Sequence, residues 1–353
     1  MQKLQELLEE LSNAHGISGY EGSICEIMKR ELGPFCDEMR VDKMGNLIAT
    51  RKGKADAPSV MVASHMDEIG LMVKYIDDNG FLNFVTVGGF FSQTLLNQRV
   101  VVHTTNGPIV GVIGSKPPHV MKEEDKKNPV KIDDMFVDVG AKNHDDAISL
   151  GVDIGTPMSI DRDFKVMKND LVTGKAFDNR AGCAMLIEAM RQISEMDVDA
   201  TIYAVGTVQE EVGLKGARTS AFGLNPDVAL ATDVTIPGDH PGITKKDASV
   251  SIGKGPVLTV VDAAGRGIMV PPSILKWLTG TAKDKGIDYQ LDVGDGGTTD
   301  ATSIHMTREG IPTGVLSVAT RYIHSPVEVL DMNDLKASAK LIAESVASVG
   351  KYF

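Results

Sequence analysis

Apolar residues recur at helical spacing at the start of the chain. They form one stripe of an acidic opening helix and comprise Leu4, Leu7, Leu8 and Leu11. A second helix is predicted around Ser23, because Ser23 and Glu26 match the capping-box pattern and apolar residues follow at helical steps. The run 60–64 is then almost entirely apolar, which is typical of a strand buried on both faces in a parallel sheet.

Strands and helices alternate again in the second half of the chain. Strand-like runs lie at 202–208, 228–232 and 313–318, and an amphipathic helix is predicted from Asp178 onward. The segment 335–349 has apolar residues at helical steps and should pack on the sheet. This alternation is typical of an α/β fold.

The segment between these two α/β regions has a sequence pattern typical of β-hairpins. An Asn-Gly pair at 79–80 and another at 106–107 each separate two strand-like runs, and this pair is the strongest short-range signal for a hairpin turn. Helical patterns are scarce there. We therefore predict a larger α/β domain, made of residues 1–68 and 166–353, with a smaller β domain inserted at 69–165.

Length and composition agree with two domains and exclude some partners. A chain of 353 residues exceeds what one core usually supports, and 42% hydrophobic with 24% charged residues is typical of a globular protein. The net charge of −12 and the lack of a stripe rich in Lys and Arg argue against a nucleic-acid partner.

The same survey predicts the cellular compartment. The acidic N-terminal segment does not resemble a signal peptide, and the sequence has no apolar run long enough to cross a membrane. The three cysteines are too scattered for a disulfide framework. We therefore expect a cytoplasmic protein without a membrane partner.

Two adjacent carboxylates, Glu210 and Glu211, follow the strand predicted at 202–208. At a strand end the chain can turn, so one carboxylate can bind a cation while the other accepts a proton in the same pocket. Taken alone, such a pair is most simply a solvated turn. The catalytic interpretation gains support because other predicted strands also end at His or Asp.

Those other strand ends supply His65, Asp233 and His324, and Asp178 lies at the start of a predicted helix. Sites in open α/β sheets form at the carboxyl ends of strands, so these side chains can meet the Glu pair there. Two imidazoles and several carboxylates suit a pair of divalent ions such as zinc, cobalt or manganese. Asp67 is two residues after His65 and can orient its imidazole. Singly, each residue can also be a cap, a turn former or a hydrogen-bonded histidine.

Other features have weaker claims on function. Cys183 lies in an apolar helical pattern and is interpreted as a core residue, and His119 has no obvious partner. The Gly-rich segment 294–300 lacks the Gly-Lys-Ser/Thr ending of a phosphate loop. It can instead let backbone approach a substrate, with Asp300 as a helix cap. No Gly-x-Ser-x-Gly motif is present, which argues against a serine hydrolase.

Five short motifs occur in order along the chain, namely HMDEIG at 65–70, AFDNR at 176–180, VQEEVG at 208–213, DVT at 233–235 and RYIHS at 321–325. With these motifs the chain strongly resembles the tetrahedral (TET) aminopeptidases. These are dinuclear metallo-exopeptidases that include glutamyl and leucyl aminopeptidases. The likeness extends from residue 17 to the final helix. One departure is the run 296–301, which is shorter in many relatives and which concerns the shape of the substrate pocket.

The resemblance implies a fold, a cofactor and an assembly. The implied fold is α/β, with a mixed sheet sandwiched by helices and an inserted small β-barrel-like domain. The implied cofactor is two divalent metal ions per subunit, zinc or cobalt. The inserted domain would help to build dimers, which would assemble into a hollow tetrahedral dodecamer. The implied metal ligands are Asp178 as the bridge, His65 and Asp233 in one site, and Glu211 and His324 in the other.

The implied reaction is removal of the N-terminal residue from short peptides with a free N-terminus, by attack of a metal-bridging water. Glu210 would be the general base that passes the proton to the leaving amine, and Asp67 would orient His65. The sequence leaves the side-chain preference open among Leu, Met, Glu and Lys, with a neutral or hydrophobic residue favoured.

Two alternatives to the peptidase stay open. Some relatives carry an endoglucanase label, although glycosidases normally use two carboxylates without paired metals. A metal-stabilised scaffold whose β domain binds peptides without cleaving them is the other alternative, and it is less favoured because every expected ligand is present.

Overall fold

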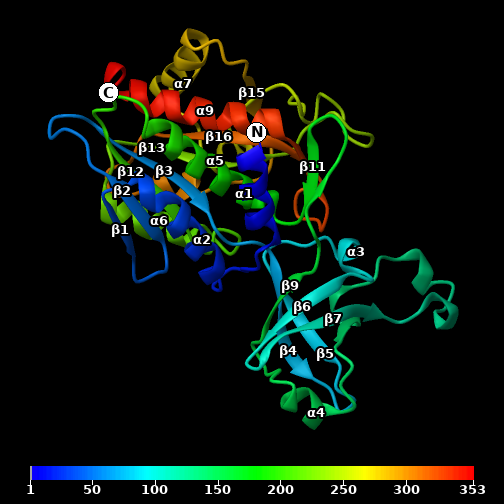
Figure 1. Cartoon of the computed structure of the whole chain (residues 1–353). Coiled ribbons are helices and arrows are strands. Elements are labelled where there is room, and N and C mark those ends of the chain that lie inside the picture. Colours follow the sequence, from blue (N-terminus) through cyan, green and yellow to red (C-terminus); the bar gives the residue numbers. More distant parts are fainter. Residues whose placement is uncertain (1) are drawn as a thin grey trace.

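The computed structural model describes residues 2–353 of the chain. A sheet covered by helices forms the larger body, and a β-barrel extends from it (Figure 1). Short 3-10 helices occur at η1 (Gly33–Phe35), η2 (Pro118–Val120), η3 (Asp125–Lys127), η4 (Ile132–Asp134), η5 (Ala263–Gly265) and η6 (Val349–Lys351). Within residues 2–353, no helix combines the length and the hydropathy that a membrane crossing requires.

An eleven-stranded mixed sheet lies at the centre of the larger body, and its main path has the order β1-β2-β12-β3-β13-β16-β17-β11-β10. Strands β14 and β15 branch from β16. The strands are β1 (Glu38–Val41), β2 (Leu47–Arg51), β3 (Ser59–His65), β10 (Lys165–Val166), β11 (Leu171–Gly174), β12 (Thr201–Thr207), β13 (Val228–Thr235), β14 (Val257–Val261), β15 (Gln290–Val293), β16 (Thr313–Arg321) and β17 (Glu328–Asp331).

The central strands of this sheet run parallel and bring their carboxyl ends to one edge. β12 and β3 pair in parallel with Thr207 opposite His65, and β13 pairs in parallel with β16. The outer strands β1, β17 and β10 pair antiparallel with their neighbours, which makes the sheet mixed. The segments that follow β3, β12, β13 and β16 therefore all emerge at the same edge.

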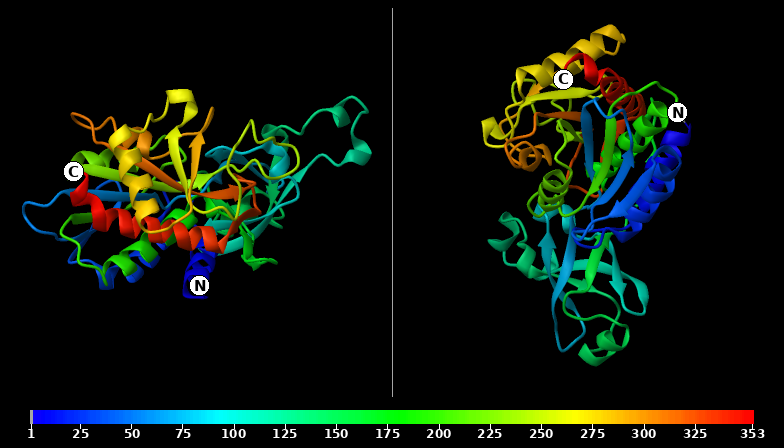
Figure 2. Two further views of the ribbon diagram at one scale, coloured as in Figure 1. Left: turned by 90° about the horizontal axis from the view of Figure 1, so that it is seen from above. Right: turned by 90° about the vertical axis from the view of Figure 1, so that its left-hand side faces the viewer.

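Helices cover both faces of the sheet (Figure 2). One face is covered by α1 (Gln2–Asn13), α2 (Gly22–Leu32), α5 (Phe177–Ile193) and α9 (Met332–Ser348), with α7 (Pro272–Asp284) against α9; the other is covered by α6 (Lys215–Leu224) and α8 (Ala301–Ile304). In β3, Val60 and Val62 join the core of the first face, whereas Met61 and Ala63 join that of the second, as the two-residue period of a strand requires. The predicted helix-sandwiched mixed sheet is confirmed.

Six strands close into an antiparallel barrel in the order β4-β5-β8-β7-β6-β9. They are β4 (Gly70–Ile76), β5 (Leu82–Val87), β6 (Arg99–Thr104), β7 (Gly107–Ser115), β8 (Met135–Asp138) and β9 (Pro157–Ile160), with α3 (Ser92–Leu95) and α4 (His144–Ser149) between them. The barrel has a separate core that includes Leu71, Phe84, Val102 and Ile113. Gly80 and Gly107 have positive φ in the two predicted hairpin turns. The predicted β-barrel-like insert is confirmed as an element of the fold.

A buried group of charges lies where the chain passes from β3 into the barrel. Lys175 Nζ donates hydrogen bonds to both carboxylate oxygens of Glu68 at 2.9 and 2.8 Å, and Arg180 Nη2 lies 3.5 Å from Glu68 Oε1. Glu68 Oε1 also accepts a hydrogen bond from the backbone N–H of Gly16 at 3.0 Å. These contacts tie the α1–α2 connection, the start of the barrel and α5 together next to the carboxyl edge of the sheet.

Candidate active site

Ligand-type side chains converge at the carboxyl edge of the sheet. Possible ligand atoms lie within 4.8 Å of one another in three overlapping groups, which are His65 with Asp178 and Asp233, Asp178 with Glu211 and His324, and His65 with Glu210 and Glu211. β3 ends at His65, Asp233 lies within β13, and the other residues lie in turns beyond β12 and β16 or at the start of α5. The structure thus brings together the residues that the strand ends suggested.

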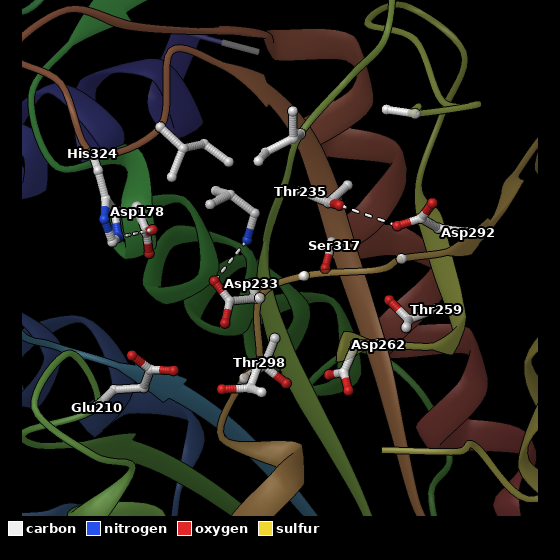
Figure 3. Close-up of a pocket in the computed structure, with 18 of the residues that line it drawn as sticks. Asp178, Glu210, Asp233, Thr235, Thr259, Asp262, Asp292, Thr298, Ser317 and His324 are labelled. Carbon is white, nitrogen blue, oxygen red and sulfur yellow. Dashed lines mark hydrogen bonds and ion pairs between the residues drawn. The ribbon is translucent and has the colours of Figure 1, made fainter. Parts of the chain in front are cut away.

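Asp178 occupies the middle of this cluster and lies between two imidazoles, of which Figure 3 labels that of His324. Its Oδ1 is 3.1 Å from His65 Nε2, and its Oδ2 is 3.3 Å from His324 Nε2. The backbone at Asp178 is extended rather than helical (φ −78°, ψ 100°), so this residue precedes the regular part of α5. The two oxygens of the Asp178 carboxylate therefore contact two different histidines.

A further carboxylate stands on each side of Asp178. Asp233 Oδ1 is 3.9 Å from His65 Nε2, and Glu211 Oε2 is 3.3 Å from His324 Nε2. The other oxygen of Glu211 is buried and accepts no hydrogen bond from any described residue. A buried carboxylate oxygen without a donor is costly unless a cation or another donor binds it.

The electrostatics of the cluster also favour cations. Burial raises the pKa of Asp233 well above its usual value, and the charge of Asp178 acts in the same direction. Burial opposes a charge on His324, but Asp178 and Glu211 nevertheless raise its pKa to about 11. Within the three groups of described residues, positive charge can thus come only from protonation of the two imidazoles. Neutral imidazoles and carboxylates are the usual ligands of divalent transition metals, so the donor set fits such ions.

Asp67 holds the turn that carries the two glutamates. Its carboxylate accepts hydrogen bonds from the backbone N–H groups of Glu210 at 3.0 Å and Glu211 at 3.1 Å, and from Ser18 Oγ at 2.6 Å. Its Oδ1 is also 3.4 Å from His65 Nδ1, on the ring side opposite Asp178. Asp67 is fully buried and does not line the cavity, so it positions other residues and does not touch a substrate.

Glu210 lies beside the candidate metal ligands and faces the cavity (Figure 3). Its carboxylate is 4.0 Å from His65 Nε2. Burial raises the pKa of Glu210 well above its usual value, and the charges of Asp233 and Asp300 act in the same direction. The positive φ of Gln209 turns the chain here, so that Glu211 reaches His324 while Glu210 does not. The adjacent glutamates therefore have different surroundings.

Glu328 is a site residue that the sequence did not reveal. Its Oε2 accepts a hydrogen bond from the backbone N–H of Asp178 at 2.9 Å, and its Oε1 accepts one from that of His324 at 2.9 Å. Glu328 therefore fixes two ligand-bearing segments relative to each other. It is an ordinary acidic residue of the short strand β17, and no local pattern distinguishes it.

The structure also shows the surroundings of the weaker candidates. Cys183 is buried in α5, where burial raises the pKa of its thiol to about 12, in agreement with a core residue. His119 is exposed on the connection between β7 and β8 and does not line the cavity. The capping role suggested for Asp300 is wrong, because its side chain makes no cap hydrogen bond and instead accepts one from Thr207 Oγ1 at 2.5 Å.

A cavity of about 790 Å³ opens from the cluster. Its walls come from β13 and the segment after it, from the 294–299 loop, and from Ile323 and His324 after β16. The Gly-rich loop thus lies where it can contact a bound molecule, as its sequence suggested. The volume is typical of sites for small molecules or short peptide segments.

Comparison with known proteins shows relatives along nearly the whole chain. The family model for M42 glutamyl aminopeptidases matches residues 45–341. A putative aminopeptidase of Acetivibrio thermocellus is 41% identical over 341 residues, which cover 97% of this chain and 98% of that protein. The lysyl aminopeptidase of Pyrococcus furiosus is 38% identical over 342 residues, covering 95% of this chain and 94% of that protein.

Solved structures show the same relationship. A TET aminopeptidase from the marine sediment archaeon Thaumarchaeota archaeon SCGC AB-539-E09 has a TM-score of 0.94 and 40% identity, over 98% of this chain and 96% of that one. The TET1 peptidase of Pyrococcus horikoshii has a TM-score of 0.87 and 35% identity, over 98% and 99%. A Thermotoga maritima protein described as an endoglucanase has a TM-score of 0.78 and 31% identity, over 97% and 99%. The resemblance to the TET aminopeptidases is thereby confirmed, and the chain belongs to the M42 family of glutamyl aminopeptidases.

Proposed function

We propose that this M42 aminopeptidase is a dinuclear metalloenzyme that removes the N-terminal residue from short peptides with a free N-terminus. The observation that carries the proposal is the position of Asp178, whose two oxygens address His65 on one side and His324 on the other. Asp233 and Glu211 complete the two groups. This arrangement supports two neighbouring cation sites that share one carboxylate.

In the proposed site, His65, Asp178 and Asp233 would hold one divalent ion, and Asp178, Glu211 and His324 would hold the other. When bound, zinc or cobalt would polarise the scissile carbonyl and lower the pKa of a nearby water. The buried Glu211 oxygen that lacks a donor is the observation that best supports the need for such an ion. The mixed nitrogen and oxygen donor set suits either zinc or cobalt.

Glu210 is proposed to act as the general base. It lies next to the ligands without binding His324, and it faces the cavity in which a peptide would sit. As the water oxygen attacks the carbonyl carbon, the Glu210 carboxylate takes a proton from it. That proton passes to the amide nitrogen as the C–N bond breaks, which leaves a free amino acid and a shortened peptide. Asp67 keeps Glu210 in place through the backbone.

The barrel is proposed to serve assembly rather than chemistry. We propose that residues 69–165 form a separate unit that helps to build dimers and, from them, a tetrahedral dodecamer. The TET1 peptidase of Pyrococcus horikoshii, which can assemble into a tetrahedron or a large octahedral shell, supports this proposal. The cytoplasmic location stays a prediction.

The proposed reaction is tested by the dependence on a free amine. The zinc- or cobalt-loaded protein is incubated with a panel of peptides Xaa-Ala-Ala, with the same peptides N-acetylated, and with carboxymethylcellulose. We expect release of Xaa from the free peptides and at least about a hundredfold slower cleavage of the acetylated ones, because acetylation removes the positive charge that the carboxylates of the site would attract.

The other arms of this experiment distinguish the alternatives. Reducing sugars from the polysaccharide would support the endoglucanase alternative. Peptide binding without cleavage, measured by calorimetry on folded and metal-loaded protein, would support the scaffold. Equal cleavage of free and acetylated peptides would rule out an aminopeptidase.

A further inference from the structure

The cavity continues beyond the ligand cluster into a region that the proposed chemistry does not use. Figure 3 shows Asp178, His324 and Glu210 on one side of Asp233, and Asp262 and Asp292 on the other side. Thr235, Thr259, Thr298 and Ser317 line the space in between. A molecule that reacts at the cluster can therefore extend a side chain towards Asp262 and Asp292.

The charged residues of this far region are all negative. Outside the ligand cluster, the charged residues that line the cavity are Asp247, Asp262, Asp292 and Asp295. Among the described residues that line it, none is Lys or Arg. Lys245 and Lys246 are exposed on the loop that precedes Asp247 and do not line the cavity. A carboxylate on a ligand would meet repulsion here, whereas a cation would be attracted.

Asp262 has a carboxylate oxygen that is not used by the fold. The residue is only 7% exposed. Its Oδ1 accepts a hydrogen bond from the backbone N–H of Ile268, which fixes the turn that follows β14. Its Oδ2 accepts none from any described residue. A role in shaping the turn explains only the first oxygen, and a buried carboxylate oxygen without a donor calls for a partner.

Asp292 offers a second carboxylate at the same end of the cavity. Its Oδ2 has a long contact of 3.3 Å with the Thr235 hydroxyl, which donates to it, and the residue is only partly exposed. Burial raises the pKa of both the Asp292 and the Asp262 carboxyl groups, and for Asp262 the nearby His305 imidazole acts in the opposite direction.

The cavity wall also includes apolar residues. Val234, Ile236, Ile243 and Ile323 line the cavity together with the threonines. A cavity that combines apolar wall residues with carboxylates at one end suits a side chain with a methylene stem and a cationic head. Lysine and arginine have this construction, and leucine and glutamate lack one or both parts.

We propose that this region is the pocket for the side chain of the substrate's N-terminal residue, and that Asp262 and Asp292 select a basic residue, lysine or arginine. The proposal rests on the proposed aminopeptidase function and makes its substrate class specific. It replaces the neutral or hydrophobic preference that the sequence favoured. Asp262 and Asp292 lie outside the five motifs, directly after β14 and within β15, so the motifs carry no information about this pocket.

The test compares Lys-Ala-Ala with norleucine-Ala-Ala, because norleucine has the same straight stem without the ammonium group. The measured quantity is the ratio of kcat/KM for the two peptides with the metal-loaded protein. We expect a ratio of about a hundred, because each of the two carboxylates contributes about the tenfold effect of one hydrogen-bonded charge pair. Asp262→Asn and Asp292→Asn should each lower this ratio by about tenfold.

A matched control and a second peptide series make the outcome decisive. Asp284→Asn removes the same charge from an exposed position on α7 that does not line the cavity, and it should leave the ratio unchanged. If Asp262→Asn does not fold, judged by circular dichroism, Asp292→Asn decides. The series Ala-Lys-Ala and Ala-norleucine-Ala reports on the second residue. An effect of the Asp variants there instead would overturn the proposal, because the pocket would then hold the leaving part of the peptide.

Failure of this inference can be told apart from failure of the proposed function. If the protein cleaves the peptides but prefers norleucine, or if both variants keep the wild-type ratio, the pocket assignment is wrong and the aminopeptidase stands. If no peptide is cleaved at all, the proposed function itself is wrong and the pocket assignment falls with it.

Discussion

Glu210→Gln is expected to lower kcat by about a hundredfold to ten-thousandfold, the contribution typical of a general base. Glutamine has nearly the same shape but cannot take up a proton as a carboxylate does. Glu210 reaches no closer than 4.0 Å to His65 Nε2, and its partner Glu211 makes the contact with His324. The variant should therefore bind metal almost as well as the wild type, which elemental analysis after gel filtration measures alongside peptide release.

Two matched variants show whether this effect is specific to the base. Glu211→Gln should lose metal as well as activity, because in the proposed site Glu211 would bind an ion together with Asp178 and His324. Glu195→Gln, at an exposed position beyond the end of α5, should change neither. Near-normal turnover of Glu210→Gln, with a normal metal content, would show that Glu210 is not the base.

Glu68→Ala is expected to lower the stability of the protein by about 3–5 kcal/mol, because it leaves buried cations without their counter-charge. Lys175 and Arg180 are 2% and 0% exposed, and both lie against the Glu68 carboxylate. Lys175 Nζ would keep only its hydrogen bond to the Ala14 carbonyl. For a chain of this size the loss corresponds to a drop in the thermal unfolding midpoint on the order of 5 °C, measured by calorimetry at matched protein concentration.

The control for this prediction is Glu9→Ala, which removes a glutamate from the exposed side of α1 and should shift the midpoint by less than about 1 °C. The pH dependence provides a second check. Burial opposes the charge of Glu68, but Lys175 and Arg180 hold its pKa below the usual value. Its stabilising effect is therefore present above the unfolded-state pKa and is lost as the pH falls towards the folded-state pKa. An unchanged midpoint for Glu68→Ala would show that the charges are not coupled.

The convergence of the candidate metal ligands could be predicted because it follows from strand ends. His65 ends β3, and Glu210 and Glu211 follow β12; these two strands pair in parallel, with Thr207 opposite His65. Once the apolar runs are interpreted as parallel strands, their carboxyl ends must lie at one edge. The sheet register therefore converts a pattern along the chain into proximity in space.

The residues that support the ligands could not be predicted in this way. Glu328 and Asp178 are 150 positions apart and meet only through the fold. The capping box predicted at Ser23 is wrong for a related reason: Glu21 occupies the N-cap of α2, and the Ser23 hydroxyl donates to the carbonyl of His15. The Glu21 carboxylate instead accepts a hydrogen bond from the backbone N–H of Gln209 at 3.0 Å and so supports the glutamate turn. Long-range contacts override a local pattern that is correct in composition.

The acidic end of the cavity could not be predicted from the sequence for the same reason. Asp262 follows β14 and Asp292 lies in β15, and neither belongs to a motif that the sequence made conspicuous. Their carboxylates share a cavity with His65 and Asp178 because β14 pairs with both β15 and β16. The proposed pocket for the substrate side chain could therefore be recognised only from the fold, whereas the candidate catalytic residues could be recognised from the sequence.

Metal titration of the metal-depleted protein bears most directly on the dinuclear site. The protein is treated with a chelator, shown to be folded, and titrated with zinc or cobalt while release of the N-terminal residue from a free tripeptide is followed. We expect almost no cleavage without metal and a rise in rate that saturates at about two ions per chain. Full cleavage by folded protein that contains no metal, or saturation at one ion per chain, would contradict a dinuclear aminopeptidase.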